Sequence, residues 1–277
     1  MILYDHCMRI IGFTILIFFA LIGPIFAYES EQIKGQLKPE KDLFFNSLVV
    51  EIVDGDTLIL DNKTEVRLVG LQSPKIALGR KNYKEWPLGY EAKETLSELT
   101  LNKKVTLYYG GREMDRYGRL LAHLFTEDGA WVQGEMLKRG MARVYSFADN
   151  RSLISDMLEI EKEALNDNRG IWGLNYYKIR PQEISGKYTN SFQIISGKIV
   201  DVATVRSNTY LNFGDDYKTD FTIVVPTKVK RMFEKKDINL SDLEGKNIFV
   251  RGWLKYYNGP SIDLTHPEQL VMDQRER

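Results

Sequence analysis

The stretch VVEIVDGDTLILDNKTEVRLVGLQSPK, residues Val49–Lys75, decides the fold of the first half of the chain. Short apolar runs alternate in it with turn residues, a pattern that is typical of strands joined by tight turns. It predicts a three-stranded meander, with strands at Leu48–Val53, Thr57–Leu60 and Val66–Leu68.

The turns of this meander bring charged side chains to a common end. Asp54 and Asp56 flank the first turn, and Arg67 points away from the face that Val66 and Leu68 share on the third strand. Carboxylates beside a guanidinium suit a metal ion together with a phosphate, because each of these needs a hard, charged ligand. A surface salt bridge in a hairpin has the same sequence pattern, so this stretch alone leaves both interpretations open.

A second turn, Asp115-Arg116-Tyr117-Gly118-Arg119, leads into the apolar run Leu120–Phe125 and delivers another arginine. Together the two segments resemble the thermonuclease (staphylococcal-nuclease-like) family. The matching pieces follow the family's order between about Leu48 and Gly173, and they are Val53-Asp54-Gly55-Asp56-Thr57, Val66-Arg67-Leu68, Ser73-Pro74, Asp115-Arg116-Tyr117-Gly118-Arg119 and Ile171-Trp172.

The resemblance implies a mainly β fold with helices (α+β), in which five strands form an OB-type barrel. The apolar periodicity after the meander predicts strands at Val105–Tyr109 and Leu120–Phe125 and helices at Leu88–Leu101, Trp131–Arg139 and Ser152–Asn168. Asn150 is expected to cap the start of the last helix.

The chain beyond residue 190 predicts a second, small OB-like β-barrel. Its expected strands are Gly197–Val202, Tyr210–Phe213, Phe221–Val225, Ile248–Lys255 and Ile262–Leu264, with a short helix at Lys228–Lys235. Barrels of this type bind oligonucleotides, oligosaccharides or other domains, so the fold does not decide the function. Its aromatic residues are expected to be core, with a stacking face as the alternative; they are Tyr210, Phe213, Trp253, Tyr256 and Tyr257.

These patterns divide the chain into five segments. They are residues 1–27, a signal peptide or membrane anchor; 28–42, a linker; 43–178, the thermonuclease-like OB-barrel domain; 179–190, a second linker; and 191–277, the second OB-like domain.

The N-terminal segment predicts export. Residues 10–27 carry no charged side chain, follow Arg9, and contain the helix-breaking pair Gly23-Pro24. A cleaved signal peptide is the favoured interpretation and an uncleaved anchor the alternative. Either one places the body in the periplasm, outside the cell, or on a membrane that it contacts through this segment.

Composition limits the partners. The chain has 38 basic and 38 acidic residues, so no overall field draws it to nucleic acid and any polyanion site must be local. Cys7 is the one cysteine and precedes the apolar run, which excludes a disulfide in the exported body. No sequence feature indicates an obligate oligomer.

The resemblance also implies a calcium-dependent phosphodiesterase site. In the family, two aspartates and a backbone carbonyl bind the ion, a glutamate orients the attacking water, and two arginines hold the phosphate. Carried over, Asp56 is the first metal ligand, Ser73 supplies the carbonyl, and Arg67 and Arg119 form the clamp. Asp54 is expected to serve as a substitute ligand.

The sequence departs from the family where the second aspartate and the glutamate belong. The family's Asp-x-Pro-Glu run is here Gln72-Ser73-Pro74-Lys75. An amide and an ammonium replace two carboxylates, and hard divalent cations prefer charged oxygen. A divalent metal is therefore expected to bind weakly, and Lys75 is expected to contact phosphate.

The segment after Lys75 interleaves basic and aromatic residues, with Lys81, Tyr83 and Lys84 as its candidate substrate contacts. Positive charge meets phosphates and rings stack on bases in single-stranded nucleic acid sites. The same pattern is equally typical of an ordinary solvated loop, so both interpretations stay open.

Three functions follow from these patterns. The first is an exported nuclease that hydrolyses DNA or RNA with altered metal ligation. The second is a degenerate nuclease fold that binds nucleic acid or nucleotides without cleavage. The third is an interaction module, which the retained Arg67 and Arg119 disfavour.

Overall fold

The computed structural model describes residues 31–39, 46–216 and 218–273. The expected signal peptide or anchor lies outside these ranges, so its fate stays a prediction. Within these ranges, no helix combines the length and the apolar character that crossing a membrane requires.

Contacts divide the chain into two compact units. Unit 1 comprises Met1–Tyr145 and Ser152–Ile171, and unit 2 comprises Ser146–Arg151 and Trp172–Arg277. Each unit is described below by itself. The domain limits expected from the sequence stay a prediction.

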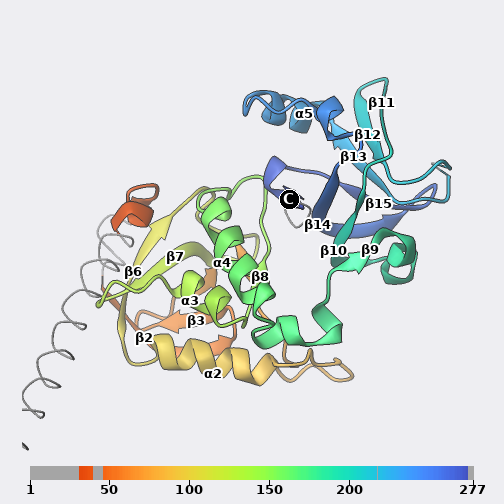
Figure 1. Ribbon diagram of the computed structural model, residues 1–277. Coiled ribbons are helices and arrows are strands. Elements are labelled where there is room, and N and C mark those ends of the chain that lie inside the picture. The colour runs from red at the N-terminus through yellow and green to blue at the C-terminus, as the bar shows by residue number, and fades with distance from the viewer. Residues whose placement is uncertain (1–30, 40–45, 217, 274–277) are drawn as a thin grey trace, which may run out of the picture. The chain divides into compact units, whose positions relative to one another are not determined.

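Unit 1 is built on a closed five-stranded barrel, as the sequence predicts (Figure 1). Its strands are β2 (Ser47–Asp54), β3 (Thr57–Leu60), β4 (Glu65–Leu68), β6 (Lys104–Tyr109) and β7 (Leu120–Thr126). They follow the order β2-β3-β4-β7-β6, and β6 pairs with both β7 and β2, which closes the barrel. The pairing of β4 with β7 is parallel and the other pairings are antiparallel.

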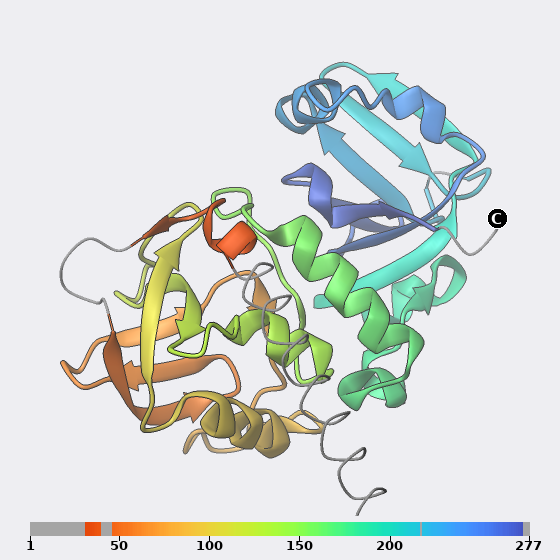
Figure 2. The same ribbon diagram turned by 60° about the vertical axis from the view of Figure 1, so that its left-hand side comes forward.

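Helices and short strands surround this barrel. They are α2 (Gly89–Thr100), α3 (Val132–Lys138), α4 (Ile154–Asn166), β5 (Leu71–Gln72) paired with β8 (Arg143–Val144), and β1 (Lys38–Pro39) paired with β6. α2 follows the third barrel strand and lies alongside β2 (Figures 1 and 2). The 3-10 helix η1 (Gly170–Gly173) follows α4 in the chain.

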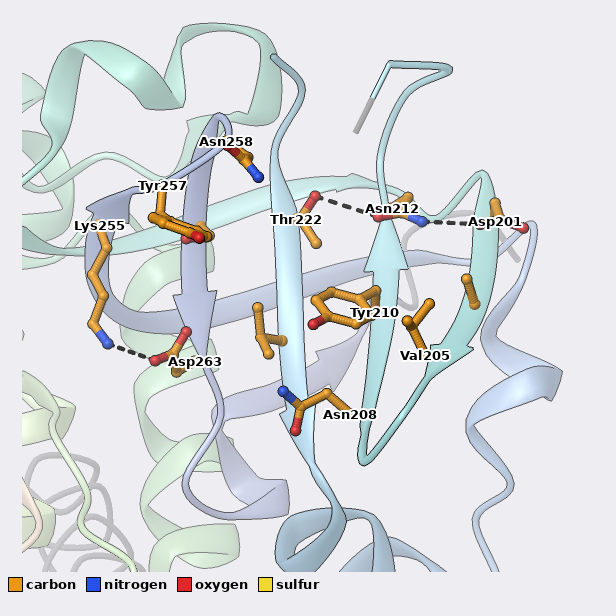
Figure 3. A pocket seen from close by; sticks show the side chains of 13 residues that line it. Asp201, Val205, Asn208, Tyr210, Asn212, Thr222, Lys255, Tyr257, Asn258 and Asp263 are labelled. Atoms are coloured by element: carbon orange, nitrogen blue, oxygen red, sulfur yellow. Dashed lines mark hydrogen bonds and ion pairs between the residues drawn. The ribbon is translucent and has the colours of Figure 1, made fainter. Parts of the chain in front are cut away.

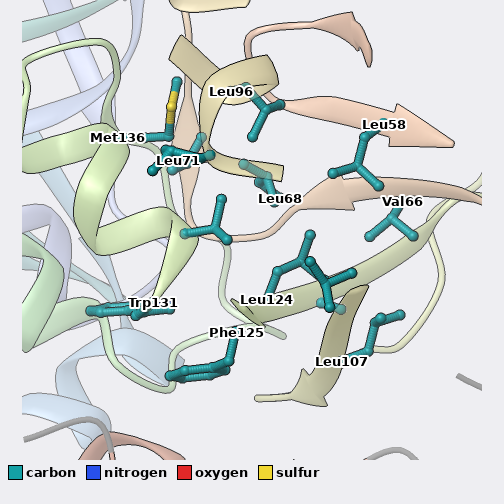
Figure 4. Packing of buried hydrophobic residues seen from close by; sticks show 14 of the residues in the cluster. Leu58, Val66, Leu68, Leu71, Leu96, Leu107, Leu124, Phe125, Trp131 and Met136 are labelled. Carbon is teal, nitrogen blue, oxygen red and sulfur yellow. The ribbon is translucent and has the colours of Figure 1, made fainter. Parts of the chain in front are cut away.

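The core of unit 1 fills the barrel and the gap to its helices. Alternate residues of the strands point inward, because successive side chains of a strand face opposite sides. Leu58, Val66 and Leu124 come from three different strands and meet inside, while Leu96 of α2 and Met136 of α3 cover them (Figure 4). All five are fully buried, so burial of apolar side chains is what fixes the barrel.

The start of α4 differs from the expectation. The helix begins at Ile154 after Leu153, which has φ 61° and makes no side-chain cap. Asn150 instead donates its backbone N–H to the carbonyl of Phe147, a contact inside unit 2. The prediction of an Asn150 cap is therefore wrong, because a tight turn engages Asn150 four residues before the helix begins.

Unit 2 has a strand order like that of unit 1, in an eight-stranded sheet for which no closing pairing is found among the described residues. Its strands are β9 (Arg180–Pro181), β10 (Ser191–Lys198), β11 (Asp201–Val205), β12 (Asn208–Asn212), β13 (Thr222–Pro226), β14 (Asn247–Tyr256), β15 (Pro260–Asp263) and β16 (Leu270–Met272). The order β11-β12-β13-β15-β14-β10 repeats that of unit 1, with a parallel pairing of β13 and β15. A helix, α5 (Thr227–Glu234), again follows the third strand.

Two details of unit 2 correct the sequence interpretation. The expected strand Gly197–Val202 is the junction of two strands, because β10 pairs with β14 and β11 pairs with β12. The expected linker at 179–190 carries β9, the 3-10 helix η3 (Gln182–Tyr188) and a parallel pairing with β10. Pro181 and Gly186 indicated a loop, but Pro181 lies in the two-residue strand β9 and Gly186 lies within η3. The remaining 3-10 helices are η2 (Asn175–Tyr177), η4 (Leu240–Leu243) and η5 (Pro267–Gln269).

Candidate functional site

The turn between β2 and β3 holds two buried carboxylates. Asp54 Oδ1 accepts the backbone N–H of Asp56 at 3.0 Å, which fixes the turn. A Cβ on Gly55 would lie 2.7 Å from Ala92 Cβ and 2.8 Å from Ser73 Cβ. Only glycine lets this turn approach α2 and Ser73 so closely.

Asp56 is the centre of the site. Its carboxylate accepts the backbone N–H of Ser73 at 2.9 Å and the hydroxyl of Thr57 at 3.3 Å, and it forms an ion pair with Arg67. Its side chain has no exposed surface. A buried carboxylate needs such partners, because leaving it unpaired costs several kcal/mol. The sequence assigned the backbone carbonyl of Ser73 to this site, whereas the contact between Ser73 and Asp56 is made by the backbone N–H of Ser73.

Lys75 completes the cluster. Its ammonium nitrogen lies 2.6 and 2.7 Å from the two carboxylate oxygens of Asp56 and 3.0 Å from Asp54 Oδ2. The carbonyl of Lys75 accepts the N–H of Trp86 at 2.8 Å and closes the loop between them. Burial and the charge of Arg67 lower the pKa of Lys75 to about 7, against the opposing effect of the Asp54 carboxylate, so the charged form predominates below that pH.

Arg67 extends from β4 on the same side. Its guanidinium donates to the carbonyl of Leu71 at 3.1 Å in addition to the ion pair with Asp56. Burial lowers the pKa of Arg67 to about 10, which leaves the guanidinium charged at neutral pH.

Arg119 reaches the same face from the turn before β7. The parallel register pairs Val66 with Leu120 and Arg67 with Leu121, which brings Arg119 beside Glu65. Asp115 holds the guanidinium with contacts of 2.7 and 2.8 Å, and Glu65 lies 3.9 Å away. The positive charge of Arg119 also lowers the pKa of Arg67. The register therefore brings the two predicted clamp arginines to one face.

Sequence reasoning missed Arg143. β5 pairs with β8 so that Gln72 lies opposite Arg143, and Gln72 Oε1 accepts from Arg143 Nε at 3.2 Å and from its NH2 at 2.8 Å. The guanidinium also lies over the ring of Trp86 at 5.8 Å. The signal was the amide of Gln72, an acceptor that needs a donor, but a sequence separation of 71 residues hid the pairing.

A divalent metal does not fit this donor set. Both oxygens of Asp56, Oδ2 of Asp54 and Oε1 of Gln72 already accept from cationic groups. A divalent ion ~4 Å from the Lys75 ammonium would be repelled by about 8 kcal/mol at an effective dielectric constant of ~20. In the part of the chain that the structure describes, no group of three or more His, Cys, Asp or Glu side chains could hold a metal ion.

The loop after Lys75 is ordered by its own contacts. Arg80 stacks on the ring of Tyr83 at 3.8 Å and donates to the carbonyls of Ile76 and Ala77 at 2.9 and 3.0 Å. Lys81 and Lys84 are exposed. Both lysines can meet a phosphate chain, whereas one face of Tyr83 is covered by Arg80.

Comparisons with known proteins agree with this geometry. The family model described as "Staphylococcal nuclease homologue" matches residues 65–173. A thermonuclease of Staphylococcus hyicus is 30% identical over 132 residues, which cover 45% of this chain and 73% of that protein. An SPbeta prophage-derived endonuclease of Bacillus subtilis is 35% identical over 130 residues, 45% of this chain and 43% of that protein.

An uncharacterized endonuclease of Escherichia coli O157:H7 is 30% identical over 127 residues, 45% of this chain and 74% of that protein. The family match ends at residue 173 and leaves most of unit 2 outside it. The chain therefore belongs to the thermonuclease (staphylococcal-nuclease-like) family of nucleases.

Proposed function

We propose that unit 1 hydrolyses phosphodiester bonds of nucleic acid, and that the Lys75 ammonium takes the place of the family's divalent cation. The observation that carries this proposal is the position of Lys75 Nζ, within 3.0 Å of both Asp54 and Asp56. Of these, Asp56 is the metal ligand that the family resemblance implies, and Asp54 is the expected substitute ligand. The nuclease names of the relatives support the reaction class.

The charge at the site supports the same conclusion. Against the family's Asp-x-Pro-Glu run, Gln72 removes one negative charge and Lys75 replaces a negative by a positive charge. The run therefore becomes more positive by three units, whereas a divalent ion supplies two. Stabilising negative charge in the transition state is the main requirement of phosphoryl chemistry, and fixed cations can meet it.

The residues then take distinct roles. Arg67 and Arg119 hold the phosphate, and Lys75 adds the third positive charge beside it. Asp56 and Asp54 are positioning residues, because they fix Lys75 and Arg67. Lys81, Lys84 and Tyr83 extend the contact to neighbouring nucleotides. In the reaction a water oxygen attacks phosphorus, one P–O ester bond breaks, and the departing oxygen takes a proton.

The second candidate is binding of nucleic acid or nucleotides without cleavage. The observation that favours it is that Lys75 stands where the family has its water-orienting glutamate. Without that carboxylate the attacking water has no positioned base at this point. The two candidates share every phosphate contact and differ only in turnover.

Cleavage assays separate the two candidates. The purified chain is mixed with labelled single-stranded and duplex DNA and RNA, with calcium, magnesium, manganese or a chelator. We expect cleavage in the chelator, and a loss of about 10² in rate on Lys75→Met or Arg119→Ala, the range found on removing one transition-state donor. Lys104→Met is the matched control, since that lysine of β6 is exposed and lies outside both the carboxylate cluster and the loop after Lys75.

Two outcomes oppose the proposal. Tight binding without turnover under all conditions would establish the second candidate. Cleavage that requires calcium and tolerates Lys75→Met would show that the ion displaces the ammonium.

We also infer that the chain is exported, from the uncharged run at residues 10–27. Fractionation of producing cells, with N-terminal sequencing of the mature protein, tests export and distinguishes a cleaved signal from an anchor. Protein that stays in the cytoplasm would contradict it.

A further inference from the structure

The outer face of the sheet in unit 2 holds a cavity of about 780 Å³. Alternate residues of β11, β12, β13 and β15 line it, together with the turns at Val205–Asn208 and Tyr257–Asn258. The residues between them, such as Leu211 and Ile223, point into the core. The cavity therefore lies on the opposite side of the sheet from the core, and its lining is not needed to pack that core.

An aromatic ring stands at the centre of this cavity. The cross-strand register places Tyr210 between Ala203 on β11 and Val224 on β13 (Figure 3). Both neighbours are short, so the face of the Tyr210 ring is left accessible. Tyr257, which is 80% exposed, contributes a second ring from the turn between β14 and β15.

Polar groups border the central ring. Asn212 Nδ2 donates to Asp201 Oδ2 at 2.9 Å, and Thr222 Oγ1 donates to Asn212 Oδ1 at 3.4 Å, in the next row of the sheet (Figure 3). Asn208 lines the cavity on the other side of Tyr210. These linked side chains are already ordered, which lowers the entropy cost of binding a ligand.

The charge of the cavity is slightly negative. Lys255 is paired with Asp263 at 2.5 Å, and Asp201 adds a further carboxylate. The loop between β12 and β13 adds Asp215, Asp216 and Asp220 against Lys218, and Arg206 lies in the turn between β11 and β12, so the surroundings stay negative. Single-stranded nucleic acid sites need a positively charged groove along the backbone. This cavity has aromatic rings without that groove, so phosphate chains are disfavoured.

We propose that this face of unit 2 binds a neutral oligosaccharide. The apolar C–H face of a sugar ring can stack on Tyr210 and Tyr257, and its hydroxyl groups can bond to Asn208, Asn212 and Asp201. Amides and carboxylates provide both donors and acceptors for hydroxyls. Clefts of ~300–1,000 Å³ hold ligands of several rings, and OB-type barrels use this face for oligosaccharides or oligonucleotides. The tyrosine rings, the polar side chains and the negative charge of the cavity favour a neutral sugar over an oligonucleotide.

The test presents the full chain to an array of immobilised neutral oligosaccharides, with sialylated and sulfated ones as charged counterparts. We expect binding to neutral members, with a change of less than about twofold between low and high salt, because no ion pairs with phosphate or sulfate form. Affinity for the best member is then measured by calorimetry for variants.

Tyr210→Ala and Tyr257→Ala should each weaken binding by about tenfold, because each change removes one of the two rings on which the sugar stacks. Tyr256→Ala is the matched control, because Tyr256 is 67% exposed and does not line the cavity. Tyr257 lies in a turn, so its variant keeps the test valid if Tyr210→Ala fails to fold. Far-UV spectra and melting temperatures establish folding.

The proposal is overturned if no neutral oligosaccharide binds, or if only charged ones do. A ten-nucleotide oligothymidylate serves as the competing probe. If Tyr210→Ala or Tyr257→Ala weakens binding of this probe and leaves the glycans unaffected, the face belongs to nucleic acid instead.

Discussion

The ammonium nitrogen of Lys75 lies 2.6 and 2.7 Å from the two carboxylate oxygens of Asp56, which the chain otherwise buries completely. A lysine thus occupies the position that a bound ion would need. Three expectations follow from this arrangement and from the contacts around it, and a fourth concerns His266, a buried histidine of unit 2.

Calcium affinity should return when the family's carboxylates are restored. Gln72→Asp together with Lys75→Glu gives three carboxylates beside Asp54 and removes the ammonium. We expect calcium to bind at least about tenfold more tightly than to the unchanged chain, which corresponds to ~1.4 kcal/mol. Calorimetric titration measures it, and equal affinities would place the defect elsewhere.

Removing the ammonium should destabilise unit 1. Lys75→Met keeps most of the side-chain volume but leaves Asp54 and part of Asp56 without a counter-charge. Breaking a buried pair in this way costs roughly 3 kcal/mol. Urea unfolding of the variant measures the free energy, and Lys84→Met, at an exposed position, should change it by less than about 0.5 kcal/mol. A neutral result for Lys75→Met would mean that the carboxylates find other partners.

Gly55→Ala should also be destabilising, for a steric reason. The new methyl group would sit 2.7 Å from Ala92 Cβ, so the turn must move away from α2. Overpacking of this kind costs about 1–3 kcal/mol. Thermal denaturation measures the loss, with Gly186→Ala as the comparison because its nearest contact would be 3.8 Å. If both variants melt alike, the close approach of the turn is not rigid.

Unit 2 should lose stability as the pH falls below about 6.5. Burial lowers the pKa of His266 to about 4, and its ring nitrogens contact the hydroxyls of Ser146 and Thr265 at 2.7 and 2.8 Å. In the unfolded chain the histidine binds a proton near pH 6.5, whereas in the folded chain it does so only near pH 4. The free energy of unfolding that is present above pH 6.5 is therefore lost on acidification. The loss approaches about 3 kcal/mol near pH 4.

Glu268, the carboxylate near His266, changes its protonation at a lower pH than the histidine does. Burial raises the pKa of Glu268, but hydrogen bonds from Arg151 and Lys236 outweigh it and lower the pKa to about 2. Its contribution is therefore lost mainly below pH 4.5. Melting curves of the chain and of His266→Gln between pH 7 and pH 4.5 isolate the histidine; parallel curves would contradict its role.

The barrel of unit 1 could be predicted from the sequence because its core residues alternate with outward-facing residues along each strand. Thr57–Leu60 is a strand with the predicted bounds. The alternation of Val66, Arg67 and Leu68 correctly predicted that Arg67 lies on the face opposite its two buried neighbours. The family resemblance supplied the closure of the barrel. The strands of unit 2 followed from the same kind of pattern, with one strand divided at Ile199–Val200.

The contacts of Lys75 could not be predicted in the same way. The sequence predicted a Lys75 contact with phosphate, whereas its ammonium pairs with carboxylates 19 and 21 residues away. That pairing depends on how closely the turn at Gly55 packs against Ser73, which is tertiary geometry. The Gln72–Arg143 contact and the Tyr210 cavity likewise arise from strand register, and neither has a local sequence signal.

A charge on a tethered side chain cannot diffuse away from its site. The tether of Lys75 keeps its ammonium at the carboxylates at a fixed, high effective concentration, whatever ions surround the protein. A free ion can be removed by a chelator or depleted by a dilute environment, and this one cannot. The same tether removes a means of control, since no change in ion supply can switch the site on or off.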